Sequence, residues 1–197
     1  MKGETFVFFG IVGSGKGTQV QLLTNYLKNK DDKEVVYIGT GEIFRSIMAS
    51  DDSDPLTQLV KELVLAGKLI PDKETNELVL RATNEKVSPD KTVIYDGYPR
   101  TVPQSEVFAN LMQEHGRENI HIIYIELSEA EAMQRNLLRG RADDTEEGLK
   151  KRFEEYRTNV IPAMNYFKDK ENYTIHTING EQPMQDVHKD ILRNLHI

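Results

Sequence analysis

The nine residues from Gly10 to Thr18, GIVGSGKGT, join a glycine-rich turn to a lysine and a threonine. A loop of this kind, placed between a strand and a helix, points several backbone N–H groups and the positive end of the helix dipole at one anion. Lys16 can reach the outer phosphates of a nucleotide, and the Thr18 hydroxyl can ligate Mg²⁺. The pattern therefore predicts a phosphate-binding loop. Gly17 departs from the generic motif, because it separates the lysine from the hydroxyl residue.

Arginines form the second group of residues that could take part in chemistry. Phosphoryl transfer needs little covalent chemistry from the protein and much fixed positive charge around the transferred group. Four arginines fall within eighteen residues, and two more come shortly after expected strands. The first four are Arg135, Arg139, Arg141 and Arg152, and the other two are Arg45 and Arg100. We expect Arg141 and Arg152 above all to serve a site, and we expect Asp143 and Asp144 to hold arginines in place.

Five short apolar or β-branched runs, separated by helical patterns, must position these residues. The runs are Thr5–Phe9, Val35–Ile38, Thr92–Tyr95, Ile120–Leu127 and Tyr173–Ile178. Strands that alternate with helices predict a parallel sheet covered on both faces, whose ligands bind beyond the carboxyl ends of the strands. Four of the five runs lead into glycine-containing loops at that edge. Capping-box spacing predicts helix starts at Ser128 and at Asp144.

Composition narrows the class of protein. The net charge is −7 and the pI about 5.3, so we expect no nucleic acid and no membrane partner. The absence of cysteine excludes disulfides and thiolate zinc sites, and the five histidines show no metal-ligand spacing. No apolar stretch approaches the roughly 20 residues that span a bilayer. We expect one main domain and a cytoplasmic location.

Six segments in their order along the chain resemble the adenylate kinases, within the nucleoside monophosphate kinases. GIVGSGKGTQ resembles the phosphate loop of that family, in which a glycine also follows the lysine. The other segments are GTGEIFR from Gly39, KLIPD from Lys68, DGYPRTVPQ from Asp96, the residues Arg141, Asp143, Asp144 and Arg152, and NGEQP from Asn179. The resemblance covers nearly the whole chain.

The resemblance implies an α/β fold: a three-layer sandwich with a central five-stranded parallel sheet, a P-loop core, an inserted helical AMP-binding segment and a very short lid. It implies a core of residues 1–40, 72–134 and 153–197, an AMP-binding segment of residues 41–71, and a truncated lid of residues 135–152. Only five residues, from Asn136 to Gly140, separate Arg135 from Arg141. We therefore expect that the lid shields the site poorly, or that residues 41–71 or a neighbouring subunit complete the closure.

The implied reaction is ATP + AMP = 2 ADP with Mg²⁺, without zinc and without a general base. The implied ATP-binding residues are Gly13, Ser14, Gly15, Lys16, Gly17, Thr18, Arg135 and Gln182. The implied AMP-binding residues are Thr40, Arg45, Lys68, Leu69, Ile70, Gly97, Tyr98, Pro99, Arg100, Gln104, Arg141 and Arg152. The implied catalytic residues are Lys16, Arg45, Arg100, Arg139, Arg141 and Arg152. The implied metal contacts are Thr18 directly and Asp96 through water.

Two substitutions distinguish this chain from the family pattern. Val12 replaces the customary proline of the loop, and Glu42 replaces the usual aspartate. Three other functions stay open at this stage: a kinase for UMP, CMP or another nucleoside monophosphate, a kinase of a small metabolite that shares only the phosphate loop, and an inactive nucleotide-binding regulatory protein. Thr40 and Gln104 favour adenine, and the retained Lys16 and Asp96 favour activity. The sequence does not distinguish a monomer from a homo-oligomer.

Overall fold

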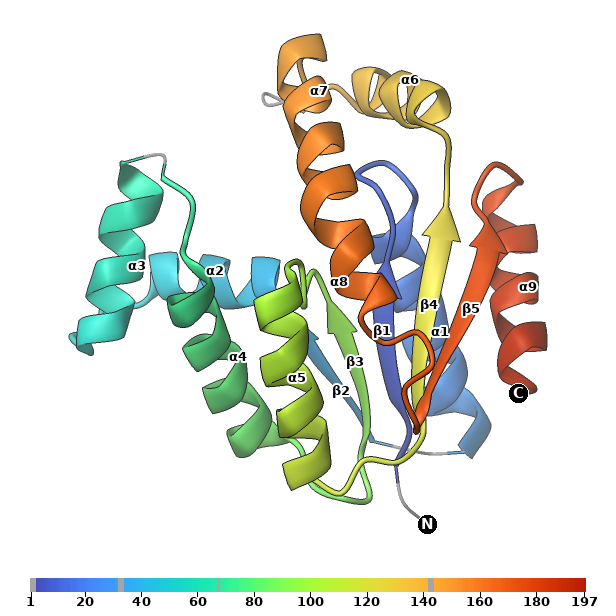
Figure 1. Ribbon diagram of the computed structural model, residues 1–197, viewed down its shortest axis with the longest axis horizontal. Coiled ribbons are helices and arrows are strands. Elements are labelled where there is room, and N and C mark those ends of the chain that lie inside the picture. Colours follow the sequence, from blue (N-terminus) through green and yellow to red (C-terminus); the bar gives the residue numbers. More distant parts are fainter. Residues whose placement is uncertain (1–2, 32–33, 67, 142–143) are drawn as a thin grey trace.

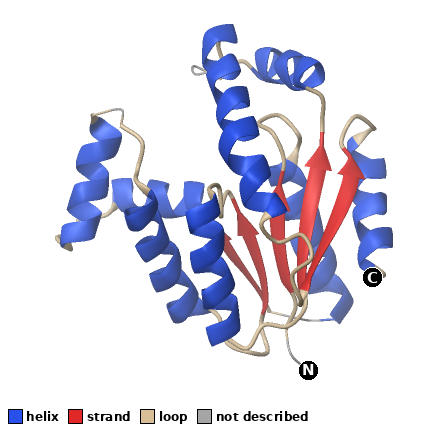
Figure 2. Cartoon of the chain, viewed as in Figure 1, coloured by secondary structure: helices blue, strands red, loops and turns tan. Residues whose placement is uncertain are grey.

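The computed structural model describes residues 3–31, 34–66, 68–141 and 144–197. Its centre is a parallel sheet in the order β2-β3-β1-β4-β5 (Figures 1 and 2). The strands are β1 (Thr5–Phe9), β2 (Val35–Gly39), β3 (Thr92–Asp96), β4 (Ile120–Glu126) and β5 (Tyr173–Asn179). The predicted parallel sheet is confirmed, and each observed strand ends within one residue of the expected end.

Helices cover both faces of this sheet. They are α1 (Lys16–Asp31), α2 (Thr40–Ala49), α3 (Pro55–Leu65), α4 (Asp72–Lys86), α5 (Val102–Glu114), α6 (Glu129–Arg139), α7 (Glu146–Glu155), the π-helical turn η1 (Tyr156–Val160), α8 (Ile161–Asn165) and α9 (Met184–Leu195). Helices α1 and α9 lie on one face, and α4, α5 and α8 lie on the other (Figure 1). None of the helices in the described part of the chain is long and apolar enough to cross a membrane.

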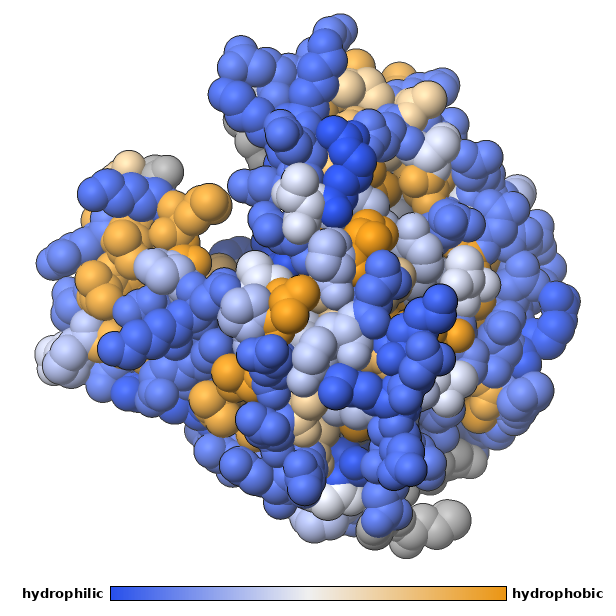
Figure 3. Space-filling view, viewed as in Figure 1, coloured by the Kyte–Doolittle hydropathy of each residue, from blue (hydrophilic) through white to orange (hydrophobic). Residues whose placement is uncertain are grey.

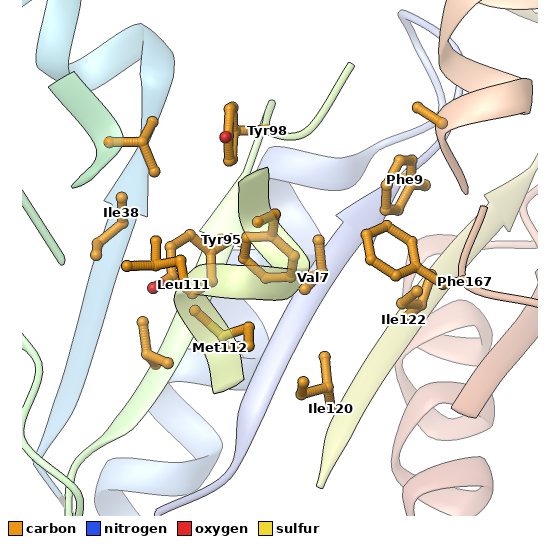
Figure 4. Packing of buried hydrophobic residues seen from close by; sticks show 14 of the residues in the cluster. Val7, Phe9, Ile38, Tyr95, Tyr98, Leu111, Met112, Ile120, Ile122 and Phe167 are labelled. Atoms are coloured by element: carbon orange, nitrogen blue, oxygen red, sulfur yellow. The ribbon is translucent and has the colours of Figure 1, made fainter. Parts of the chain in front are cut away.

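The central strand β1 is apolar along most of its length because both of its faces are covered. All five of its residues are buried. Phe6 and Phe8 pack with residues of α1 and α9, whereas Val7 and Phe9 pack with residues of α5 and α8 (Figure 4). Two apolar cores thus hold β1 in the middle of the molecule.

A buried arginine ties the strands together at their amino ends. Arg117 is 5% exposed and follows α5. Its guanidinium donates to the Thr5 hydroxyl at 2.8 Å and to the carbonyl oxygens of Glu4 at 2.7 Å and Lys91 at 3.0 Å. Buried polar groups of this kind are tolerated only when their donors are satisfied. Arg117 therefore joins the segments that lead into β1 and β3, on the edge opposite the glycine-rich loops.

Side-chain caps begin two of the helices near the arginine cluster. The predicted start of α6 is confirmed, because the Ser128 hydroxyl accepts from the Glu131 backbone N–H. The predicted cap of α7 at Asp144 is wrong: the Thr145 hydroxyl caps this helix by accepting from the Gly148 N–H at 3.1 Å. The carboxylate of Asp144 is instead bound by two arginine side chains.

Two histidines meet on neighbouring strands. Nδ1 of His121 on β4 lies 3.0 Å from Nε2 of His176 on β5, and their rings stack, with Phe6 stacked on His121. A hydrogen bond between the rings requires an unprotonated acceptor nitrogen. Burial lowers the pKa of His121, and burial together with the charges of His121 and His196 lowers the pKa of His176 to about 4. The fold therefore keeps this pair neutral.

We expect acid to destabilise the fold through His176. The unfolded ring binds a proton below its ordinary pKa of 6.5, but the folded ring does so only near pH 4, so the free energy of unfolding falls as the pH drops through this window. Urea unfolding at about pH 7 and about pH 5 should show a smaller loss for His176→Asn than for the wild type. His115→Asn, at the end of α5, serves as the control. Equal losses for the wild type and both variants would contradict the prediction.

Candidate active site

The carboxyl ends of β1, β2 and β3 open onto a cleft of about 600 Å³. A notch in the surface separates the lobe that carries α3 from the part that carries α6 and α7 (Figures 1 and 3). Ten of the residues predicted for the site line the cleft: Lys16, Thr40, Lys68, Leu69, Ile70, Gly97, Pro99, Arg100, Gln104 and Arg152. Residues that are far apart in the sequence, and that come from both predicted nucleotide sites, thus share one cavity.

The phosphate loop runs from the end of β1 to the start of α1. Gly13 and Gly15 both have φ of +88°, a backbone conformation that residues with a Cβ rarely adopt. The Lys16 ammonium donates to the carbonyl oxygens of Gly10 at 2.5 Å and Ile11 at 3.1 Å. The loop therefore wraps around its own lysine, and its exposed residues Gly15, Gly17 and Thr18 face solvent.

Charges from three elements act on Lys16. Burial lowers its pKa to about 8, the Asp96 carboxylate opposes that shift, and the guanidiniums of Arg100 and Arg139 add to it. Charges influence one another's pKa mainly at short range. The cations predicted to hold donor and acceptor phosphates therefore lie near one another.

Asp96 ends β3 and is half-buried. The hydroxyl of Tyr37 on β2 donates to its Oδ2 at 3.3 Å. Gly39 makes room for that tyrosine, since a Cβ at Gly39 would lie 2.2 Å from the tyrosine oxygen. The hydroxyl of Thr18 and the carboxylate of Asp96 are oxygen donors of the kind that Mg²⁺ prefers, and Mg²⁺ commonly keeps several waters and phosphate oxygens as its other ligands. Their chemistry fits a metal that binds with a nucleotide.

The turn after β3 brings its backbone close to α2. Gly97 has φ of +76°, and a Cβ there would lie 2.7 Å from the hydroxyl oxygen of Thr40. That hydroxyl donates to the Gly97 carbonyl oxygen at 3.1 Å, and Arg100 Nε donates to the same oxygen at 2.8 Å. The Tyr98–Pro99 peptide is cis. Only glycine fits at this meeting point of β3, α2 and the arginine.

Arg100 lines the cleft, where protein atoms surround it, and it is still exposed to solvent. Partial removal from water lowers its pKa, and the carboxylates of Asp96 and Glu155 oppose this shift. Behind it, the buried Gln104 accepts from the Arg100 backbone N–H at 2.8 Å and donates to Asp72 Oδ1 at 2.7 Å. The amide of Gln104 is thus oriented by protein partners on both of its ends.

Residues from α2 and from the segment before α4 border the other side. Lys68, Leu69 and Ile70 line the cleft, and the side chain of Leu69 is 80% exposed. Arg45 is exposed on α2, where a Cβ on Gly41 would lie 3.3 Å from its Nη1. Arg45 is not among the residues that line the cleft.

A buried carboxylate organises the arginines of the predicted lid. The Asp144 side chain is 0% exposed and accepts from Arg139 Nε at 3.0 Å, Arg139 Nη2 at 2.9 Å and Arg152 Nη2 at 3.0 Å. The Arg141 backbone N–H also donates to it at 3.2 Å, whereas the Arg141 side chain is exposed. Hydrogen bonds from Arg139 and Arg152 hold the pKa of Asp144 down at about 2. Asp143, predicted to share this role, lies outside the described residues.

Two further predicted ATP residues border the loop after β5. Arg135 Nη1 donates to the Gly180 carbonyl oxygen at 3.0 Å, and its Nε donates to Glu131 at 2.7 Å. The Gln182 side chain donates to Asp190 Oδ2 on α9 at 2.6 Å. The structure therefore places Arg135 beside the NGEQP loop, and Arg135 is not among the residues that line the cleft.

Known proteins match most of this chain. The family model described as adenylate kinase matches residues 8–172. Adenylate kinase 1 of Nostoc sp. is 32% identical over 189 residues, which cover 96% of this chain and 97% of that protein. The adenylate kinase of Corynebacterium diphtheriae is 33% identical, with 92% and 93% covered, and that of Thermus thermophilus is 34% identical, with 84% of each covered.

The chain belongs to the adenylate kinase family. It is a nucleoside monophosphate kinase, a phosphotransferase of the reaction ATP + AMP = 2 ADP. Members of this adenylate kinase family bind ATP, AMP and ADP as substrates, and the family generally uses ATP with Mg²⁺.

Sequence analysis missed several residues that line the cleft or contact the phosphate loop. Glu155, Tyr156 and Asn159 line the cleft from the end of α7 and from η1, and nothing in their spacing indicates this. Asn136 of α6 is fully buried and contacts the phosphate loop. A signal for Asn136 does exist, because it stands one helical turn after Ala132 on the buried face of an amphipathic helix.

We expect Asp144→Asn to lower the melting temperature at neutral pH, because Arg139 and Arg152 lose their shared anion while the side chain keeps its size. The carboxylate stabilises the fold above its ordinary pKa of 3.8, and this contribution is lost as the pH falls toward 2. Differential scanning calorimetry should therefore show a gap between wild type and variant that narrows below about pH 4. The control, Asp186→Asn, removes an exposed carboxylate of α9. A constant gap would contradict the prediction.

Proposed function

We propose that the chain transfers the terminal phosphoryl group of Mg²⁺-bound ATP to AMP by positioning and electrostatics, with the residue roles below. The single observation that supports this is the shared cleft, lined by Lys16 of the phosphate loop, Arg100 of the β3 turn and Arg152 of α7. Cations from three elements surround one space, as the charge on a transferring phosphoryl group requires.

On the donor side, the backbone N–H groups of Gly13, Ser14, Gly15, Gly17 and Thr18 and the ammonium of Lys16 hold the β- and γ-phosphates. The lysine then exchanges the carbonyl oxygens of the loop for phosphate oxygens, at no loss of hydrogen bonding.

Residues beside the NGEQP loop complete the donor half. Arg135 packs on the adenine, and the backbone around Gln182 borders it. The contact of Arg135 with the Gly180 carbonyl supports this role, because it places the guanidinium next to that loop.

On the acceptor side, Arg45 and Arg100 hold the AMP phosphate in line with the donor. The backbone of the Lys68–Ile70 segment and of Gly97, Tyr98 and Pro99 lies along the nucleotide. Thr40 and Gln104 face the adenine. The amide of Gln104 supports recognition of a base edge, because Arg100 and Asp72 fix its orientation.

Thr18 and, through water, Asp96 would hold Mg²⁺ bound to ATP, and the ion would supply positive charge next to the donor phosphates. Around it, Arg139, Arg141 and Arg152 neutralise the charge that spreads over the transferred group. Asp144 holds two of these guanidiniums in place before the reaction.

Residues 41–71 form the AMP-binding segment, residues 135–152 the truncated lid, and the remainder the core. Arg135 lies within α6 and Arg152 within α7, so the lid consists of the facing ends of two helices and the short connection between them. Leu137 and Leu138 on α6 are 42% and 80% exposed. A lid this short covers little of a donor nucleotide.

We expect Arg100→Ala and Arg141→Ala to reduce kcat roughly 10³-fold or more while the protein stays folded, by analogy with other arginines that stabilise this charge. Coupled assays of ADP formation, with circular dichroism for folding, measure this. Arg193→Ala on α9 is the matched control, because its guanidinium pairs with Asp190 of the same helix and is not among the residues that line the cleft.

Substantial turnover in both Arg100→Ala and Arg141→Ala would contradict the assigned roles. The same assay with AMP, UMP and CMP as acceptors tests the base. A higher kcat/KM for UMP or CMP than for AMP would contradict the roles of Thr40 and Gln104.

We expect the truncated lid to admit water to the donor, so that ATP is hydrolysed when AMP is absent. Open phosphoryl donors react with water when the closing segment is incomplete. Phosphate release from ATP alone should exceed that of an adenylate kinase with a longer lid, at matched forward rates. Equal release would mean that another segment or a second subunit completes the closure.

A further inference from the structure

Asn136 is the only fully buried polar residue of α6 among the described residues, and its position is unexpected for an amide. It is 0% exposed. One turn earlier on the same helix, Ala132 belongs to an apolar cluster that includes Ile11, Leu149 and Phe153. An amide beside such a cluster is costly unless its hydrogen bonds are made, so its partners identify what it is for.

The first set of partners lies in the phosphate loop and in α6 itself. Nδ2 of Asn136 donates to the Val12 carbonyl oxygen at 3.0 Å and to the Ala132 carbonyl oxygen at 2.6 Å. The loop also approaches this amide closely, because a Cβ on Gly13 would lie 2.4 Å from Nδ2. Asn136 therefore fastens α6 to the loop that precedes Lys16.

The second partner is an arginine of the proposed site. Oδ1 of Asn136 accepts from Arg139 Nη2 at 2.7 Å. The same guanidinium binds Asp144, which also binds Arg152. One buried amide thus connects the phosphate loop, through Arg139, to the carboxylate that orients two arginines of the lid.

We propose that Asn136 is a positioning residue of the ATP half of the site, which fixes the phosphate loop and Arg139 relative to one another. The inference rests on the proposed role of Arg139. Helix α6 ends at Arg139 and α7 begins at Glu146, so the connection between them is short. So short a lid provides little support for the Arg139 guanidinium. Asn136 supplies that support from inside the helix.

Steady-state kinetics of two variants test the proposal. Asn136→Leu keeps the approximate volume and removes every hydrogen bond of the amide. We expect its KM for ATP to rise about tenfold or more and its kcat to fall, with the KM for AMP unchanged. A purely structural role would lower the melting temperature and the amount of active enzyme but leave both KM values unchanged.

Asn136→Asp separates the two connections. The carboxylate still accepts from Arg139, but it cannot donate to the Val12 carbonyl. We expect kcat to recover toward the wild-type value relative to Asn136→Leu, while the KM for ATP stays raised. Equal kcat in the two variants would overturn the part of the proposal that concerns Arg139.

The matched control is Asn194→Leu on α9. Its Nδ2 also donates to the carbonyl oxygen four residues earlier, at 2.9 Å, but it lies away from the phosphate loop on an exposed surface. We expect wild-type kinetics from it. Wild-type KM for ATP in Asn136→Leu would overturn the proposal. If Arg139→Ala also had wild-type kinetics, the proposed role of Arg139 would fail as well, whereas an inactive Arg139→Ala would confine the failure to Asn136.

Discussion

The parallel pairing of β1 with β3 on one side and β4 on the other is the interaction on which the whole site depends. Parallel strands must all end at the same edge, so the loops that follow them share one space. The phosphate loop follows β1, and the turn that contains Gly97 follows β3, its hydrogen-bonded neighbour. Lys16 and Arg100 therefore meet through strand pairing, before any nucleotide contributes.

Placing many cations at one edge creates repulsion that the protein must offset. Burial is the main cause of the lowered pKa of Lys16, and the nearby guanidiniums of Arg100 and Arg139 lower it further. Two carboxylates counter the repulsion, Asp96 beside the lysine and Asp144 beneath the arginines. In a protein with a net charge of −7, each of these groups of cations is thus accompanied by a carboxylate that favours its charged form.

Local signals carried much of the fold and of the candidate site. Strand positions followed from apolar runs, and the loop between β1 and α1 followed from its glycines, of which Gly13 and Gly15 have positive φ angles. The cap of α7 was predicted wrongly, because Asp144 has the right local spacing for a cap but gains more from Arg139 and Arg152. Arg117 gave no usable local pattern, since its partner Thr5 lies 112 residues away in sequence. The helical pattern marks Asn136 as buried, but it does not reveal the partner Val12, which lies 124 residues away. Tertiary contacts of this kind are invisible to periodicity and capping rules.

The buried guanidinium of Arg117 has a consequence for motion. It bonds together the segments that lead into β1 and β3, while the opposite edge carries the phosphate loop and the turn after β3. Local opening requires less free energy where buried contacts are few. Amide protons should accordingly exchange slowly in β1 and β3 and progressively faster toward the cleft, so that rigidity at one end of the sheet coexists with mobility at the other.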